Sequence, residues 1–297
     1  VIAQAPRAHL VGHTPYNHYA QQAEAWLAGR LDLGGPPPSY SGNNDFARRD
    51  GKYYVSFGPV PAVLLVPFVA AAGSAERVRD GQIFMLLSGL APAVLFLALE
   101  RLRRLRRNPR TQEDNAMLAL LFALGSVFWF SAAQGTVWFA GHVVATACCC
   151  GYILCSLGAW QPLLAGLLLA LAVGTRPSLA FALPLFAYEL RREAGDRRAM
   201  LRKAAAFALP LCVVGGLIAW HNLARFGDPL EFGHRLLAIR WRGRIDRWGL
   251  FSPHYLGRNL AIVLAGLPFY SAERGLQING HGLALWFTTP VYFWALW

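Results

Sequence analysis

The residues best suited to chemistry gather in one short polar stretch. Its side chains are Asp45, Arg48, Arg49, Asp50, Lys52, Tyr53 and Tyr54. A carboxylate can take a proton from a hydroxyl group, and cations can hold a phosphate, arginine bidentately. Tyrosine rings collect where membrane meets water. The stretch therefore predicts a polar site on a membrane surface, with Asp45 as the base and the cations and tyrosines as substrate-binding residues.

The segments on either side of this stretch predict helices that lie in or near the membrane interface. Residues 57–72 are apolar and contain three prolines, but their continuous apolar part is shorter than the roughly 17 to 25 residues of a span. Thr14-Pro15 is a typical helix start, and an apolar stripe with helical spacing follows as far as Leu31. We expect two interfacial helices beside the polar stretch.

A polar stripe, Asn17, Gln21 and Glu24, runs along the first of these helices. We interpret it as a solvated face in preference to a catalytic one. Glu24 and Asp50 nevertheless remain the candidates for a second carboxylate beside Asp45, so the metal question is open and a divalent cation is a possible cofactor.

Composition places the chain among multi-pass membrane proteins. It has 297 residues, of which 55% are hydrophobic and 15% charged, and it contains several separate long apolar runs. The formal charge of +12 is almost all arginine in the loops between these runs. Membrane orientation and anionic lipids explain that charge, and no nucleic-acid motif accompanies it. The five cysteines lie inside apolar runs without the spacing of a zinc or redox site.

The apolar runs predict an all-α fold, a multi-pass transmembrane bundle with an extracytoplasmic loop. The expected spanning segments are Gln82–Leu99, Asn115–Ala133, Val137–Leu157, two short segments within Pro162–Leu190, and Ala204–Trp220. We expect four regions: an extracytoplasmic loop with its interfacial helices (1–80), the bundle (81–220), a second extracytoplasmic loop (221–281), and the start of a further span (282–297). The chain lacks an initiator methionine and ends in an apolar run, which predicts a fragment of a longer protein.

The positive-inside rule orients this bundle. The arginine-rich run at residues 101–110 is expected on the cytoplasmic side, which places Asp45 outside. His142 then lies within two turns of the outer surface. A turn at residues 174–177 returns the short segments inward and points Arg176 into a protein-lined cavity. We expect both residues to bind substrate, with Arg176 as a phosphate ligand. The alternatives are a packing role for His142 and, for Arg176, a side chain that snorkels to the membrane surface.

The combined site fits sugar transfer from a lipid-linked phosphate. The chain has no phosphate-binding glycine loop, no HExxH motif and no nucleophile elbow. A base at Asp45 would activate an acceptor hydroxyl, which attacks the anomeric carbon while cations stabilise the departing phosphate. A single displacement of this kind inverts the anomeric configuration.

Three further motifs carry a family resemblance. They are the run from Gly51 to Ala62, the Gly174-Thr-Arg-Pro-Ser178 turn, and Arg225-Phe-Gly-Asp-Pro-Leu-Glu-Phe-Gly233. With an acidic residue in the first outer loop, the chain resembles bacterial members of the GT-C superfamily, integral membrane glycosyltransferases such as mannosyl- and arabinosyltransferases. The resemblance implies a polyprenyl-phosphate sugar donor, an envelope glycan or protein acceptor, an inner-membrane location and a catalytic role for Asp45. Some members of the superfamily use a divalent cation and others do not.

Two other classes of function remain open. A transporter or lipid flippase would use the short hairpin and a buried arginine, and it predicts functional groups near the bilayer midplane. A non-catalytic membrane subunit would explain the apolar spans but gives no reason for the polar stretch at Asp45.

Overall fold

The structure, a computed structural model, describes residues 11–41, 45–193 and 195–296. It is mostly helical and divides into two compact units. One unit covers Val1–Leu124 and Phe128–Ala238, and the other covers Gly125–Val127 and Ile239–Trp297. All of the residues discussed below as sites belong to the first unit.

Three helices of the first unit are long and apolar enough to cross a membrane. They are Asp80–Arg104, formed by α4 (Asp80–Ser88) and α5 (Leu90–Arg104); Val137–Ala159, which contains α8 (Val137–Ser156); and α11 (Arg197–Phe226). A bent pair, α6 (Gln112–Gly125) and α7 (Val127–Gln134), meets at 59° and makes a fourth if it is one span. Apolar side chains cover the exposed faces of these helices, which indicates membrane association.

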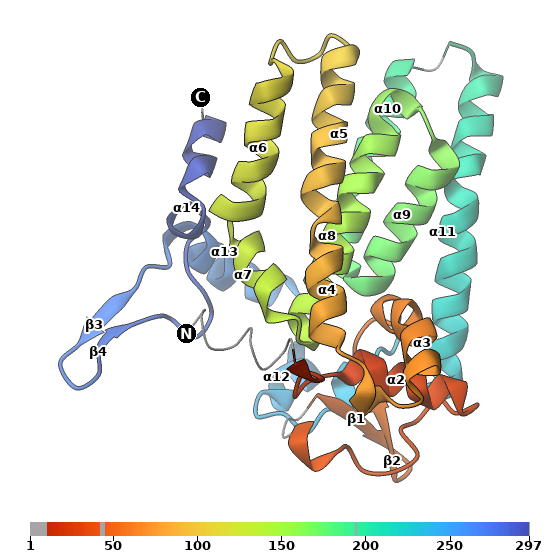
Figure 1. The fold of residues 1–297 in the computed structure, drawn as a ribbon, viewed down its shortest axis with the longest axis vertical. Coiled ribbons are helices and arrows are strands. Elements are labelled where there is room, and N and C mark those ends of the chain that lie inside the picture. Colours follow the sequence, from red (N-terminus) through yellow and green to blue (C-terminus); the bar gives the residue numbers. More distant parts are fainter. Residues whose placement is uncertain (1–10, 42–44, 194, 297) are drawn as a thin grey trace. The chain divides into compact units, whose positions relative to one another are not determined.

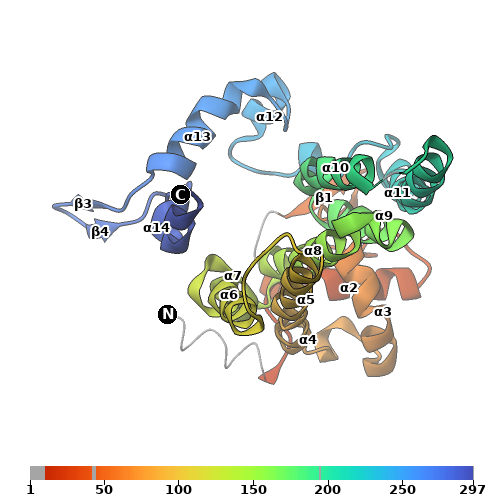
Figure 2. The same ribbon diagram turned by 90° about the horizontal axis from the view of Figure 1, so that it is seen from above.

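A helical hairpin lies between α8 and α11, as the sequence predicts. α9 (Pro162–Thr175) descends to a 3₁₀ segment, η4 (Pro177–Ala182), and α10 (Pro184–Glu193) returns. Proline at the start of each segment fits a first helical turn, where its missing N–H costs nothing. Seen from above, α5, α8, α9 and α11 lie side by side in that order (Figure 2). The expected break at residues 174–177 is confirmed.

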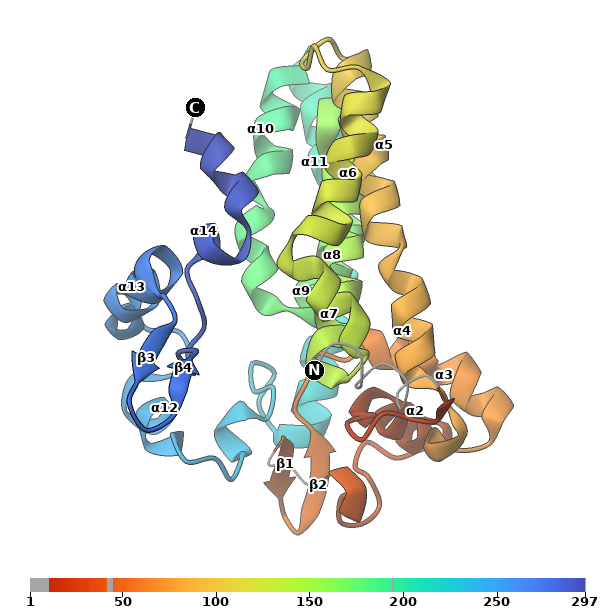
Figure 3. The ribbon, with the colours of Figure 1, turned by 60° about the vertical axis from the view of Figure 1, so that its left-hand side comes forward.

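The described residues before α4, 11–41 and 45–79, form a layer across one end of these helices (Figures 1 and 3). The layer contains α2 (His18–Leu27), strands β1 (Phe46–Arg49) and β2 (Lys52–Val55), and α3 (Val60–Ala72). α3 buries Leu65 and Val69 and exposes Val63 and Phe68. α3 is therefore apolar on its exposed face as well as on its buried one, and its expected place in the membrane interface stays a prediction.

The β1–β2 hairpin corrects the all-α expectation. Phe46 pairs with Val55 and Arg49 with Lys52 in an antiparallel ladder. The turn is Asp50-Gly51, and both residues have positive φ, 51° and 75°. Asp-Gly is a preferred sequence for such two-residue turns, because its backbone twist matches that of the strands. That dipeptide was the overlooked signal for the hairpin.

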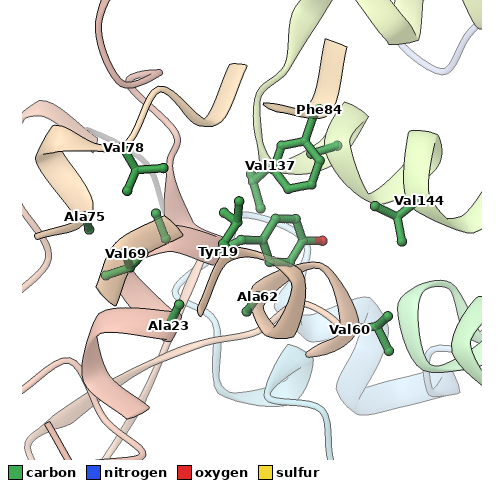
Figure 4. Close-up of a cluster of buried hydrophobic side chains, with 13 residues drawn as sticks. Tyr19, Ala23, Val60, Ala62, Val69, Ala75, Val78, Phe84, Val137 and Val144 are labelled. Carbon is green, nitrogen blue, oxygen red and sulfur yellow. The ribbon is translucent and has the colours of Figure 1, made fainter. Parts of the chain in front are cut away.

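A buried apolar cluster joins the layer to the bundle. It includes Tyr19 from α2, Phe84 from α4, and Val137 and Val144 from α8, with the α3 side chains around them (Figure 4). The interpretation of Asn17 and Gln21 as a solvated face was wrong. Both are buried, and the Gln21 amide donates to Oδ1 of Asn17 at 2.6 Å, so the stripe is an internal hydrogen-bonded contact.

The opposite end of the bundle carries the basic connections. The α5–α6 connection and the α10–α11 connection both lie there (Figure 1). Arg107 donates to both carboxylate oxygens of Glu189, at 2.9 and 2.7 Å, and to Glu193 at 2.7 Å. Glu189 also accepts from the backbone N–H of Gly158 at 2.7 Å. This network ties the α5–α6 connection and the α8–α9 connection to α10.

The second unit contains short elements only. They are α12 (Arg242–Trp248), α13 (Leu256–Ala265), a hairpin of β3 (Phe269–Ser271) and β4 (Gly275–Gln277), and α14 (Leu285–Thr288). The segment expected to start a further span contains α14 and a 3₁₀ helix, Pro290–Leu296, so its described part is not one continuous α-helix.

Candidate functional site

Asp45 lies at the base of the β1–β2 hairpin, where the layer meets α8. Its main-chain carbonyl accepts a hydrogen bond from Oγ of Ser56 at 2.8 Å, which closes the hairpin base. Its carboxylate accepts a hydrogen bond from the side chain of Trp138 in the first turn of α8. The indole N–H is the only donor that tryptophan has. The hairpin and α8 thus fix Asp45 together.

Partial burial raises the pKa of the Asp45 carboxyl above its ordinary value of 3.8, and the hydrogen bond from Trp138 opposes that rise. Burial penalises the charged form of an acid, whereas a donor stabilises it. The result is a carboxylate that binds a proton more tightly than a solvated one. Such a group is a better base toward a hydroxyl group.

Arg176 occupies the turn between α9 and η4. Gly58, just before α3, packs against this turn so closely that a Cβ there would lie 2.2 Å from the carbonyl oxygen of Gly174. A guanidinium NH₂ group of Arg176 donates to the main-chain carbonyl of Trp138. The Phe57-Gly58-Pro59 and Gly174-Thr-Arg-Pro177 motifs therefore meet, and one residue, Trp138, contacts both Asp45 and Arg176.

The Arg176 guanidinium has no carboxylate partner among the described ion pairs. Its Nε is buried and has no hydrogen-bond partner within the described residues. A Cβ added at Gly141 would lie 2.9 Å from the hydroxyl of Tyr19 and 3.1 Å from Arg176. Gly141 thus makes room for both groups. The positive charge of Arg176 also interacts electrostatically with His142, in the second turn of α8, and with His234.

Burial and this cation shift the titration of two neighbours. Burial raises the pKa of Tyr19, and the charge of Arg176 opposes the rise. Burial lowers the pKa of His234, with Arg176 adding to that effect and Glu231 opposing it. Both groups are therefore neutral at pH 7 and can act as hydrogen-bonding groups. No described carboxylate neutralises the positive charge of Arg176, so the charge is available to an anion.

The third motif holds the hairpin from its other side. Arg225, near the end of α11, donates to the carbonyl of Val55 at 2.8 Å. Phe226 meets Tyr54 edge to face at 5.3 Å. A Cβ added at Gly233 would lie 2.9 Å from the side chain of Ala47, so only glycine allows this approach. All three sequence motifs thus converge around the hairpin base.

The other predicted residues of the polar stretch lie toward the hairpin tip. Arg49 pairs with Asp50 at 3.3 Å, Lys52 pairs with Asp32 at 3.6 Å, and Arg48 lies over the ring of Tyr53 at 5.7 Å. A strand rises about 3.3 Å per residue, so the tip is roughly 13 Å from Asp45 along the chain. Arg176 contacts Trp138, the residue that also contacts Asp45, whereas the side chains of Lys52 and Asp50 are exposed to solvent. Tyr54 is buried against Phe226.

Neither candidate for a second carboxylate, Asp50 or Glu24, belongs to a group of described side chains that could hold a metal ion. The side chain of Asp50 is 83% exposed. The charge of Glu24, a residue of α2, contributes to a raised pKa of Tyr40. Within residues 11–41, 45–193 and 195–296, no group of three His, Cys, Asp or Glu side chains is arranged to hold a metal ion.

Sequence reasoning missed Tyr19, Trp138 and His234. One signal was present for Trp138, since it stands three and four residues before Gly141 and His142 and shares their helix face. Tyr19 reads as an apolar helix residue, and only the packing of α2 against α8 brings its hydroxyl to Arg176.

Comparison of the chain with family models, with curated proteins and with solved structures finds no match.

Proposed function

We propose that the chain is a membrane glycosyltransferase of the GT-C kind, which transfers a sugar from a polyprenyl-phosphate donor to an extracytoplasmic acceptor. One observation carries the proposal: Trp138 contacts both Asp45 and Arg176. The carboxyl pKa of Asp45 is raised, and Arg176 has no carboxylate partner among the described ion pairs. A base and a phosphate-binding cation are the two groups that this reaction requires.

Each group has one role in the reaction. Asp45 takes the proton of the acceptor hydroxyl, and the oxygen forms a bond to the anomeric carbon. The bond between that carbon and the donor phosphate oxygen breaks, and the electron pair leaves with the phosphate. Arg176 stabilises the charge that develops there, and charge-assisted hydrogen bonds of this type are strong. The anomeric configuration inverts.

The position of the basic connections supports an extracytoplasmic site. The α5–α6 connection and the α10–α11 connection lie at the end of the bundle opposite β1, the strand that follows Asp45, and arginine-rich short loops favour the cytoplasmic side. With the native cysteines replaced, a membrane-impermeant thiol reagent should label Asp50→Cys in intact cells and leave Arg104→Cys unlabelled. The reverse labelling pattern contradicts this orientation.

The decisive experiment measures sugar transfer from a panel of radiolabelled polyprenyl-phosphate sugars by the membrane-embedded protein. Asp45→Asn and Arg176→Gln should each lower the rate at least 100-fold. Asp50→Asn and Lys52→Gln remove a carboxylate and a cation at the hairpin tip, and both should keep the wild-type rate within about twofold. Equal losses in both pairs would contradict the site, and no transfer from any donor would contradict the function.

A lipid flippase is the second candidate, and the broken helices favour it. Arg176 stands at the break between α9 and η4, and α6 meets α7 at 59°. Broken helices and intramembrane cations are features of transporters. Proteoliposomes with fluorescent polyprenyl phosphate in one leaflet distinguish the two, because a flippase moves the lipid without an acceptor and retains that activity in Asp45→Asn.

A further inference from the structure

A second set of buried polar side chains lies between α2 and the last turns of α11. Gln22 and Trp26 stand one helical turn apart on α2, and His221 and Arg225 stand one turn apart on α11. The rings of Trp26 and His221 meet edge to face, with centroids 5.5 Å apart. Trp26 and His221 therefore bring α2 and α11 into contact at the end of the bundle that carries the layer (Figure 1).

These four side chains present polar atoms that have no hydrogen-bond partner within the described residues. The atoms are Nε2 and Oε1 of Gln22, Nε1 of Trp26, both ring nitrogens of His221, and Nε of Arg225. Gln22 and Arg225 are each 3% exposed, and His221 is 8% exposed. Buried polar groups are almost always partnered, and a cluster of exceptions requires an explanation. A ligand that bonds to them supplies one.

The charge and the donors of the cluster define that ligand. The terminal nitrogens of Arg225 donate to the carbonyl of Val55 and, at 2.9 Å, to Oδ1 of Asn222, both of them neutral groups. Donors also exceed acceptors, because Arg225, Trp26, Gln22 and one nitrogen of His221 each offer an N–H. A group with several acceptor oxygens and a negative charge complements this arrangement, and four donors suit the oxygens of a phosphate better than the two of a carboxylate.

We propose that Gln22, Trp26, His221 and Arg225 form a phosphate-binding site between α2 and α11. The site shares no side chain with the Asp45 and Arg176 site, and the inference does not depend on sugar transfer. Phosphate bound there would join α2 to α11 and hold the layer on the bundle, because Arg225 also contacts β2 through Val55. The phosphate comes from a free ion or from a lipid headgroup.

Thermal unfolding of the purified full chain in detergent tests the site. Inorganic phosphate is titrated against chloride at matched ionic strength, and the melting temperature of the wild type should rise saturably, by a few degrees at about ten times Kd. Short-chain phosphatidic acid is titrated in parallel. A shift at concentrations tenfold below those of inorganic phosphate identifies a lipid headgroup, and a shift with inorganic phosphate alone identifies the free ion.

Two conservative variants locate the binding. Gln22→Met keeps the length of the side chain and removes both amide atoms, and His221→Phe keeps a ring against Trp26. Each should weaken phosphate binding at least tenfold, and Gln22→Met should melt higher than the wild type without phosphate, because it removes a buried amide that has no protein partner. Lys52→Gln, which removes an exposed cation at the hairpin tip, is the control and should keep the wild-type shift.

Three results would overturn the proposal. The first is a wild-type melting temperature that does not respond to either phosphate compound. The second is a response that persists in both Gln22→Met and His221→Phe. The third is a response that Lys52→Gln loses as well, which would show a general attraction of phosphate to exposed cations.

Discussion

Asp45 and Arg176 are held by the same residue, Trp138, through different groups. The indole side chain donates to the carboxylate of Asp45, and the main-chain carbonyl accepts from the guanidinium of Arg176. A carboxylate and a cation from distant parts of the chain are thereby fixed relative to each other by the first turn of α8. A substitution at Trp138 can remove the contact to Asp45 without removing the carbonyl that holds Arg176.

Trp138→Phe should slow transfer and change its pH dependence. Phenylalanine keeps an aromatic ring against Tyr16, which lies 4.6 Å from Trp138, but it cannot donate to Asp45. Because that hydrogen bond lowers the pKa of Asp45, its loss raises the pKa further. The rate should fall about tenfold at pH 7, and the acidic limb of the pH–rate profile should move to higher pH. An unchanged limb would mean that Asp45 is not the titrating base.

Asp45→Asn should abolish transfer and stabilise the protein at neutral pH. Since the pKa of Asp45 is raised above 3.8, the folded state binds the proton more tightly than the unfolded state does. Stability from this group is therefore present at low pH and is lost as pH rises through the raised pKa. Melting temperatures measured from pH 4 to pH 8 should show the variant above the wild type near pH 7, with the gap closing toward pH 4.

The contrary result is informative here. A variant that melts well below the wild type at pH 7 would show that the ionised carboxylate stabilises the fold. Asp50→Asn serves as the matched control, because its carboxylate is exposed and contacts only the adjacent Arg49 among the described ion pairs. Its melting temperature should follow that of the wild type across the same pH range.

The long helices and the break at residues 174–177 followed from the sequence because apolar length and proline placement determine them locally. The hairpin was missed because the charges of Arg48, Arg49 and Lys52 suggested a loop, although Asp50-Gly51 is a strong turn signal. Asp45 was predicted as the base from its residue type and its place in the polar stretch. Its separation from Lys52 was not predictable without the strands, since proximity in sequence becomes distance along a hairpin.

The contacts around Arg176 depend on tertiary packing and had little sequence signal. Tyr19 reads as one more apolar residue of an amphipathic helix, and its hydroxyl points out of the core cluster toward α8 (Figure 4). Gln22 and Asn17 read as surface residues because polar side chains usually are. The structure buries them because α2 packs on three sides, against α3, the hairpin and α11.

Gly141→Ala should reduce transfer while the protein stays folded. The new methyl group would lie 2.9 Å from the Tyr19 hydroxyl and 3.1 Å from the Arg176 guanidinium, so the flexible arginine must move. Alanine favours a helix over glycine by about 1 kcal/mol, which offsets part of the strain. We expect at least a tenfold lower rate, measured by transfer from the active donor. Gly215→Ala in α11 adds the same methyl group where nothing lies within 4 Å, and it should keep full activity.

Glu189→Gln should destabilise the end of the bundle opposite the site. Glu189 and Arg107 are 4% and 12% exposed in their side chains, and Glu189 also holds the N–H of Gly158. Arg107 keeps its ion pair with Glu193, so the variant weakens charge-assisted hydrogen bonds without leaving a charge unpaired, and we expect a loss of about 2 kcal/mol. Lys52→Gln breaks the exposed pair with Asp32 and should cost less than about 1 kcal/mol. Denaturant unfolding of both variants compares the two costs. Equal losses would show that the Arg107–Glu189 pair contributes no more than a surface pair, and the connections at that end would then rely on apolar packing alone.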